Sequence, residues 1–419
     1  MFKRIALPVR LVLAGSVFFS AALTTVGNEA NATPAFARST GAACNKCHSE
    51  MFPRLNERGE RFMRNGFQVR GEEGVSLDAP GQGKEQAPDE GKKIASDLYL
   101  NNLSNLFSIY GVVDAVSKDT TSKNIHVGTP HTLSLLATGT LTKDIPVFME
   151  MELDAETGTV EADRFFIGMT NLGGATTANI RTGSLDPTEW TSFPSLAAEA
   201  FKAKTDHVGV YSGPDAGKDG FAEVGSGLRP RHAIEYYGYA ANLFWAAAVA
   251  NPPEGAVSAP SDKRNLDYWL VGRFDIAKTG SVSLMYYDSH FVDDAPTPAW
   301  VGTRVLSLAG NLRLPSADIL AQYTRDSGTD NHPKIFGFTL QANIPFTKQF
   351  MGVARYDMTD NGANKDSKEA VLSLGTLYKP VQNLKVTAAI TSELKRADTG
   401  SPSQAEKSTG FNLNLHYAL

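Results

Sequence analysis

The 419-residue sequence is poor in cysteine, in charge and in long apolar runs, and each shortage excludes a class of protein. Its only two cysteines lie at positions 44 and 47, so no disulfide staples the rest of the chain, and stability has to come from packing or a closed sheet. Beyond the N-terminal segment, no apolar run approaches the roughly 20 residues that a transmembrane helix requires. If the chain enters a membrane, it must therefore do so as a closed barrel.

Residues 1–32 have the composition of a secretory signal peptide. A basic start at residues 3–10 is followed by a short apolar stretch at residues 11–23 and by a small-x-small cleavage site at residues 30–32. The mature chain is then expected to begin near Thr33 with a formal charge of about −7. A mildly acidic exported protein is a poor candidate for binding nucleic acid.

The two cysteines belong to one motif, Cys-x-x-Cys-His, which His48 completes. Two thiols at this separation can add to the two vinyl groups of one porphyrin, and the adjacent imidazole can ligate its iron. The alternatives are a redox dithiol, half of a zinc site and coincidence. A redox dithiol of the thioredoxin type needs a βαβ context, and a zinc site needs another pair of ligands; the sequence has neither. The motif therefore predicts one covalent haem c on Cys44 and Cys47, with His48 as the proximal ligand of the haem iron.

The haem motif lies in a segment, residues 33–70, that is too short to bury a haem and also form a core of its own. The helical spacing of Leu55, Phe62 and Met63 predicts a short helix that closes near Asn65-Gly66. We therefore expect this cytochrome module to pack against a larger part of the chain.

Three arginines on this helical segment, Arg54, Arg58 and Arg61, have two interpretations. They form a solvated helix face, or one or two of them pair with the haem propionates, because a guanidinium offers bidentate hydrogen bonds to a carboxylate. The sequence does not choose among them.

The sixth position of the haem iron has several candidates. Met63 is the nearest plausible thioether, although a methionine at helical spacing beside a phenylalanine is also typical of core filling. His126 and His131 would reach the iron only if the following part of the chain supplies the distal side. An open position is the remaining alternative.

The composition changes twice after the module. Residues 71–96 are rich in Gly, Glu, Gln and Pro and have no apolar period, which indicates a linker. Residues 97–419 then alternate between apolar and polar side chains many times, and we assign them to one barrel domain.

A representative stretch has Tyr268, Leu270 and Phe274 on one face and Asp267 and Arg273 on the other. Alternation over about ten residues is typical of an outer-membrane strand with a lipid-facing and a lumen-facing side. The same pattern recurs at residues 133–141, 147–153, 336–344, 384–390 and 411–419.

The connections between these strands also alternate in length. Tight turns are expected at residues 143–146, 315–317, 345–348 and 379–383, and longer polar loops at residues 118–130, 251–265, 326–333, 357–368 and 395–408. Short periplasmic turns and long external loops are the barrel arrangement. The prediction is a mainly β protein, an outer-membrane antiparallel barrel of about sixteen strands with the helical c-type cytochrome module at or inside its lumen. Residues 171–232 remain unassigned.

Four carboxylates are expected to face the lumen, namely Glu150, Glu152, Asp267 and Asp275. They either guide a cation inward or are simply part of the polar wall that every such barrel needs. Acidic pairs in the loops, such as Asp293-Asp294, are either weak Fe²⁺ ligands or solvated charges.

The motif and its surroundings resemble the fused monohaem cytochrome–porin family of outer-membrane iron oxidases. The resemblance rests on the runs Pro34-Ala35-Phe36-Ala37-Arg38, Cys44 to His48 and Phe52-Pro53-Arg54-Leu55-Asn56, and on Gly59, Phe62 and Asn65-Gly66-Phe67. Over the barrel it extends to architecture and length only.

The resemblance implies that Cys44 and Cys47 carry the haem, that His48 is its proximal ligand, and that the protein lies in the outer membrane of a Gram-negative bacterium. It implies an iron(II) oxidase that passes electrons from extracellular Fe(II) through the haem to a periplasmic c-type cytochrome. It indicates no catalytic residue beyond the haem and no docking site for Fe(II). The alternatives are a haem-plugged diffusion porin and an electron conduit for another donor or acceptor.

Overall fold

The structure is a computed structural model, and it describes eighteen stretches of the chain. These are residues 35–36, 46–48, 54–67, 92–95, 98–100, 107–119, 125–126, 130–142, 144–154, 158–194, 230–251, 266–276, 279–292, 300–327, 335–360, 368–381, 384–395 and 409–418. The predicted signal peptide, Cys44 and most of the predicted linker lie outside these stretches.

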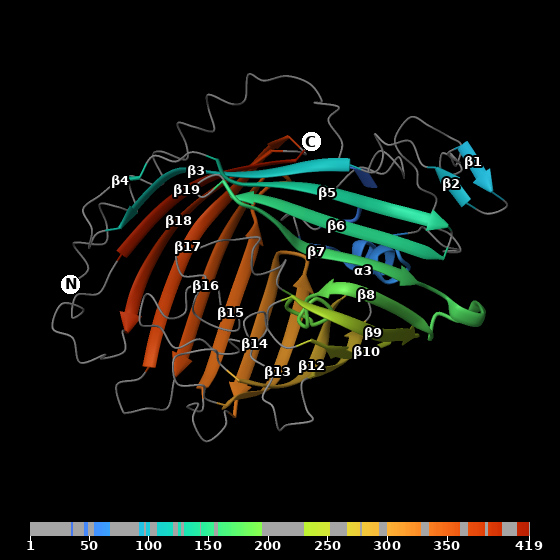
Figure 1. The fold of residues 1–419 in the computed structure, drawn as a ribbon. Helices are drawn as coiled ribbons and strands as arrows, with labels where there is room; N and C mark the ends of the chain where they lie inside the picture. The colour runs from blue at the N-terminus through green and yellow to red at the C-terminus, as the bar shows by residue number, and fades with distance from the viewer. Residues whose placement is uncertain are drawn as a thin grey trace, which may run out of the picture.

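Among the described residues, sixteen long strands form a closed barrel in which every neighbouring pair is antiparallel (Figure 1). The strands are β3 (Phe107–Asp119), β5 (Pro130–Thr142), β6 (Ile145–Asp154), β7 (Val160–Met169), β8 (Asn179–Leu185), β9 (Arg231–Ala240), β10 (Leu243–Ala250), β11 (Asp267–Ile276), β12 (Gly280–Val292), β13 (Trp300–Leu314), β14 (Ala317–Asp326), β15 (Ile335–Pro345), β16 (Phe350–Asp360), β17 (Lys368–Val381), β18 (Leu384–Lys395) and β19 (Thr409–Ala418). The ring closes where β19 pairs with β3, and the two-residue β4 (Ile125–His126) adds to the end of β3. The predicted strand number and closing strand are confirmed.

The two faces of the barrel wall differ as the sequence predicts. On β11, Tyr268, Leu270 and Phe274 are 44%, 56% and 52% exposed on the outside, whereas Asp267 and Trp269 are fully buried on the inside. The same apolar outer face continues over β9, β12 and β13. A wall that is apolar outside and polar inside is the reverse of a water-soluble barrel.

The two ends of the barrel differ in their connections. At one end, here called the short-turn end, the strands are joined by turns such as residues 241–242, 315–316 and 346–349. At the other, the long-loop end, the connections include residues 251–266 and 327–334. The predicted alternation of short and long connections is confirmed from β9 to β19, but not at β7, where the connection at the long-loop end (residues 155–159) is shorter than the one at the short-turn end (residues 170–178).

One helix of the predicted cytochrome module, α3 (Glu57–Arg64), lies within the ring of strands (Figure 1). Asn56 caps its N-terminus, and the chain turns away at Asn65-Gly66, where Gly66 has a positive φ of 67°. Acidic residues in the first turn and basic residues in the last suit the helix dipole. The predicted helix and its end are confirmed.

Two small elements accompany the long strands of the barrel. A hairpin of β1 (Lys92–Ala95) and β2 (Leu98–Leu100) forms a separate sheet, and its first strand falls in the predicted linker. A 3-10 turn, η3 (Leu172–Gly174), lies in the connection from β7 to β8. No helix among the described residues is long and apolar enough to span a membrane.

Candidate functional site

The described part of the Cys-x-x-Cys-His motif, residues 46–48, is folded back against the start of α3. His48 forms a β-bridge with Leu55, and the backbone N–H of Asn56 donates to the carbonyl of Cys47 at 2.9 Å. Cys47 and His48 are both half-buried. The second cysteine and the histidine of the motif are thus carried on a short antiparallel ladder that leads directly into the helix.

The side chain of Asn56 fastens this ladder. Its Nδ2 donates to the carbonyl oxygens of Lys46 at 3.0 Å and His48 at 3.2 Å, and its Oδ1 accepts from the N–H groups of Arg58 and Gly59, both at 3.0 Å. The amide therefore uses both of its donor hydrogens and both lone pairs of its oxygen. One residue caps the helix and holds the backbone of the haem motif.

Gly59 allows the motif to lie directly on the helix. A Cβ at this position would stand 2.1 Å from the carbonyl oxygen of Cys47 and 2.9 Å from Cδ2 of Leu55. Any other residue would push the motif away from α3. Gly59 is one of the residues on which the resemblance rests, and the close approach of the Cys47 carbonyl explains why this position needs a glycine.

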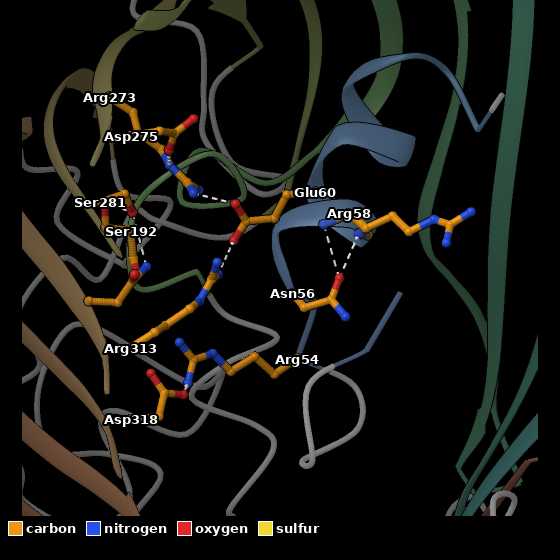
Figure 2. Close-up of polar contacts among 12 residues, drawn as sticks. Arg54, Asn56, Arg58, Glu60, Ser192, Arg273, Asp275, Ser281, Arg313 and Asp318 are labelled. Carbon is orange, nitrogen blue, oxygen red and sulfur yellow. Dashed lines mark hydrogen bonds and ion pairs between the residues drawn. The ribbon is translucent and has the colours of Figure 1, made fainter. Parts of the chain in front are cut away.

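Four ion pairs, made by three residues of the module, hold it to the barrel wall, and Figure 2 shows those of Glu60 and Arg54. Glu60 accepts from Arg273 of β11 and, at 3.1 Å, from Arg313 of β13. Two arginines of the module pair in the opposite sense: Arg54 with Asp318 of β14, and Arg64 with Asp275 of β11, the latter at 2.7 Å. We call these contacts the charged seat.

The charged seat places α3 at the short-turn end. Arg273 and Arg313 lie at the ends of β11 and β13 that precede short turns, and Asp318 lies just after the turn at residues 315–316. Burial, reinforced by the nearby charge of Arg313, lowers the pKa of the Arg54 guanidinium to about 9, so it stays protonated at neutral pH. The helix α3 thus lies inside the lumen, whereas the cytochrome module predicted at or inside the lumen stays a prediction beyond this one helix.

Aromatic rings form a second contact between the module and the wall. The ring of Phe67 lies 4.8 Å from that of Phe36, 5.8 Å from that of Phe166 on β7 and 6.1 Å from that of Phe148 on β6. Phe36 also meets Phe62 of α3 edge to face at 5.1 Å. Phe67 has a positive φ of 62°, an unfavourable conformation for a bulky residue that this packing holds in place.

A segment that the sequence did not reveal lines the lumen beside α3. After β8, residues 186–194 fold inward, and Ser192 accepts from Asn311 of β13 at 2.9 Å and donates from its N–H to Ser283 of β12 at 2.7 Å. We call residues 186–194 the inner loop. It lies within the stretch left unassigned above, and its local signal is the turn sequence Asp186-Pro187, where Asp186 Oδ1 accepts from the N–H of Thr188 at 2.7 Å.

Charge pairing and stacking fix the inner loop. Arg181 of β8 pairs with Glu189 at 2.6 Å and with Glu235 of β9 at 2.7 Å, and its guanidinium lies 4.5 Å from the ring centre of Trp190. Trp190 donates to Glu235 at 2.8 Å. Burial raises the pKa of the Glu189 carboxyl, although the charge of Arg181 opposes the shift. This loop and α3 both occupy the lumen.

The candidates for the predicted sixth iron ligand lie in different parts of the structure. Met63 packs against a buried cluster that includes Trp190 of the inner loop and Tyr237 and Phe244 of the barrel wall. His126 lies in β4 and His131 near the start of β5, both at the long-loop end, away from α3. Neither observation identifies a distal ligand, so the role of Met63 stays a prediction.

The lumen-facing carboxylates are largely paired already. Glu150 pairs with Arg164 at 2.8 Å, Asp275 with Arg64, and Asp267 accepts from Tyr287 at 2.5 Å. These contacts favour the interpretation of a polar wall over that of a cation path. The described residues contain no group of three or more His, Cys, Asp and Glu side chains that could hold a metal ion, and Asp293-Asp294 lies outside them.

Comparisons with known proteins bear on the barrel. No family model and no curated protein matches the sequence. Among solved structures, an anion-selective porin from Comamonas acidovorans superposes with a TM-score of 0.56 at 15% identity, over 75% of this chain and 99% of that one. OmpF of Salmonella typhi, in complex with daunomycin, superposes with a TM-score of 0.55 at 11% identity, over 75% and 97%.

A third similar structure is a loop-deletion variant of OmpT, an outer membrane protein of Vibrio cholerae, with a TM-score of 0.51 at 13% identity over 75% of this chain and 98% of that one. At such low identity these likenesses define the fold. The described long strands form a closed sixteen-stranded barrel with the fold of porins. In this barrel, a short helix next to a Cys-x-x-Cys-His motif is held inside the lumen at the short-turn end.

Proposed function

We propose that this protein is an outer-membrane c-type cytochrome–porin that oxidises extracellular Fe(II) and passes the electron through one haem c to a periplasmic c-type cytochrome. One observation carries the proposal: residues 46–48, the described part of the only Cys-x-x-Cys-His motif in the sequence, are bound to a helix that lies inside a closed barrel. A porphyrin on this motif would therefore be enclosed by the barrel wall.

The apolar outer face of the wall supports the location in a membrane. Its exposed residues, such as Ile234 and Leu270, would face lipid, while buried polar groups face the lumen. In outer-membrane barrels the short turns face the periplasm and the long loops face outward. The proposal thus places α3 on the periplasmic side, where a soluble electron carrier can approach.

The residues present fit a haem. Cys44 and Cys47 would hold it covalently, His48 would ligate its iron, and the buried Nη2 of Arg58, which has no hydrogen-bond partner among the described residues, offers a donor for a carboxylate. When bound, the haem supplies one-electron chemistry at the iron.

The protein's own residues have three tasks in this mechanism. Asn56 holds the backbone on both sides of Cys47, so that the motif keeps one orientation. The charged seat keeps α3 at the short-turn end, and the barrel wall separates the site from lipid. Because Fe(II) loses only an electron, no side chain has to donate or accept a proton in the step that oxidises it.

A diffusion porin is the second candidate, and the fold shared with porins favours it. The helix and the inner loop both lie in the lumen, which supports a narrowed or closed passage instead. Conductance in planar bilayers separates the two functions. A wide, steady channel in the haem-loaded protein favours the porin, whereas a closed barrel favours the electron carrier.

The direct test mixes the purified haem-loaded protein with Fe(II) at neutral or mildly acidic pH and follows the haem spectrum. The expected result is reduction of the haem with formation of Fe(III), followed by reoxidation when an oxidised periplasmic c-type cytochrome is added. A spectrum that stays oxidised in excess Fe(II) would refute iron oxidation.

A further inference from the structure

Four arginines lie in the described segment next to the haem motif, and three of them have carboxylate partners. Arg54 pairs with Asp318, Arg64 pairs with Asp275, and Arg61 pairs along the helix with Glu57 at 3.4 Å. Arg58 is the fourth. Among the described residues, no carboxylate pairs with its guanidinium, and its Nη2 is buried without a hydrogen-bond partner.

A buried guanidinium nitrogen without a partner is unfavourable, since a charged donor that has lost its water and makes no hydrogen bond is not compensated for the desolvation. Figure 2 shows that Arg58 extends from α3 to the side opposite Glu60 and the arginines of the wall. Arg58 is therefore not part of the charged seat. Its direction and its unused donor both suggest a ligand on that side of the helix.

The position of Arg58 relative to the haem motif is fixed through the backbone. Its N–H donates to Oδ1 of Asn56, and the same amide group donates to the carbonyls of Lys46 and His48. The next residue, Gly59, lies against the carbonyl of Cys47. Arg58 thus belongs to the turn of α3 that carries the motif.

We propose that Arg58 binds a propionate carboxylate of the haem. The inference rests on the covalent haem of the proposed function, but not on iron as the electron donor. A guanidinium binds a carboxylate through two parallel hydrogen bonds, which a lysine cannot reproduce. The structure thereby selects one of the three arginines among which the sequence did not choose.

The positive charge of Arg58 has a definite effect on the haem. It balances the propionate charge, which would otherwise stabilise the ferric state, so it raises the reduction potential. Without it, a propionate in a partly buried site would take up a proton more readily. Reduction of the haem would then be coupled to proton uptake, and the potential would depend on pH across the neutral range.

The test compares Arg58→Gln, Arg58→Lys and Arg61→Gln in the full-length protein. Covalent haem is measured by protein mass, the reduction potential by spectroscopic titration at several pH values, and the hydrogen bonding of the propionates by resonance Raman spectroscopy. Arg61→Gln is the matched control, because it removes an equal charge from an exposed position three residues away.

Arg58→Gln is expected to keep its covalent haem, to lower the potential and make it pH-dependent, and to shift the propionate band. Arg58→Lys should fall between Arg58→Gln and the wild type, and it also serves if the glutamine variant does not assemble. Arg61→Gln should match the wild type. Equal potentials and pH profiles in all four proteins, with haem attached, would overturn the role of Arg58.

Failure of the proposed function gives a different result. A wild-type protein with covalent haem that is not reduced by Fe(II) refutes iron oxidation and leaves the Arg58 comparison intact. A wild-type protein that carries no covalent haem when exported refutes both.

Discussion

Replacing Glu60 by glutamine is the sharpest test of the charged seat. Glu60 accepts from Arg273 and Arg313, and these two contacts join α3 to two strands of the wall. Glutamine keeps the size of the side chain and removes its charge. Both arginines then lose a carboxylate at the place where the helix meets the barrel.

The expected loss follows from the burial of the partners. Arg273 is 5% exposed, and breaking a buried ion pair by removing one partner typically costs about 3–5 kcal/mol. Arg273 keeps its contact with Asp275 at 2.7 Å, and the side chain of Arg313 is 21% exposed, so we take a lower value of about 2–3 kcal/mol. This corresponds to a change of roughly 30- to 150-fold in the ratio of seated to unseated helix.

Single-channel recording in planar bilayers measures this ratio, since an unseated helix leaves the short-turn end open. The fraction of time in an open state should rise roughly 30- to 150-fold in Glu60→Gln. Glu57→Gln is the control: Glu57 lies in the same helical turn but pairs only with exposed Arg61, where such pairs contribute about 0–1 kcal/mol. If both variants conduct as the wild type does, the charged seat does not hold the helix.

Three further changes test the site. Asn56→Ala removes a helix cap and two donors to the motif backbone, worth about 1–3 kcal/mol together, so the free energy of unfolding of the haem-loaded module should fall by this amount in a denaturant titration followed by haem absorbance. Gly59→Ala should lower the same free energy because its Cβ overlaps the Cys47 carbonyl, whereas Gly272→Ala, with nothing within 4 Å of the added Cβ, should not; equal free energies of unfolding would contradict the close packing. Trp190→Ala should loosen the inner loop by about 3–5 kcal/mol, and limited proteolysis should cleave near residue 190 faster, a result that unchanged cleavage would exclude.

Much of the barrel follows from local pattern. A strand with one apolar and one polar face repeats every two residues, so Tyr268 and Leu270 could be assigned to the outer face from the sequence alone. The alternation of short and long connections adds the antiparallel order. The end of α3 was equally predictable, because Asn65-Gly66 is a local stop signal.

The contacts that position the module do not follow from local pattern. Glu60 meets Arg273 across 213 positions of sequence, and no period or spacing marks two charges at that separation as partners. The inner loop has no repeat either, since its polar groups are satisfied by side chains on distant strands such as β12 and β13. The sequence therefore left two interpretations of the arginines open, a solvated face and pairing with a carboxylate, and it did not show which arginine pairs with which group.

The ladder between His48 and Leu55 has a consequence for biosynthesis. An enzyme that joins a porphyrin to two thiols needs an accessible stretch of chain, but here the second thiol lies on a backbone already folded onto a helix that strands surround. For the proposed haem, loading would have to be finished while the polypeptide is still unassembled. Maturation would then run in a fixed order, with the cofactor attached first and the ring of strands closed around it last.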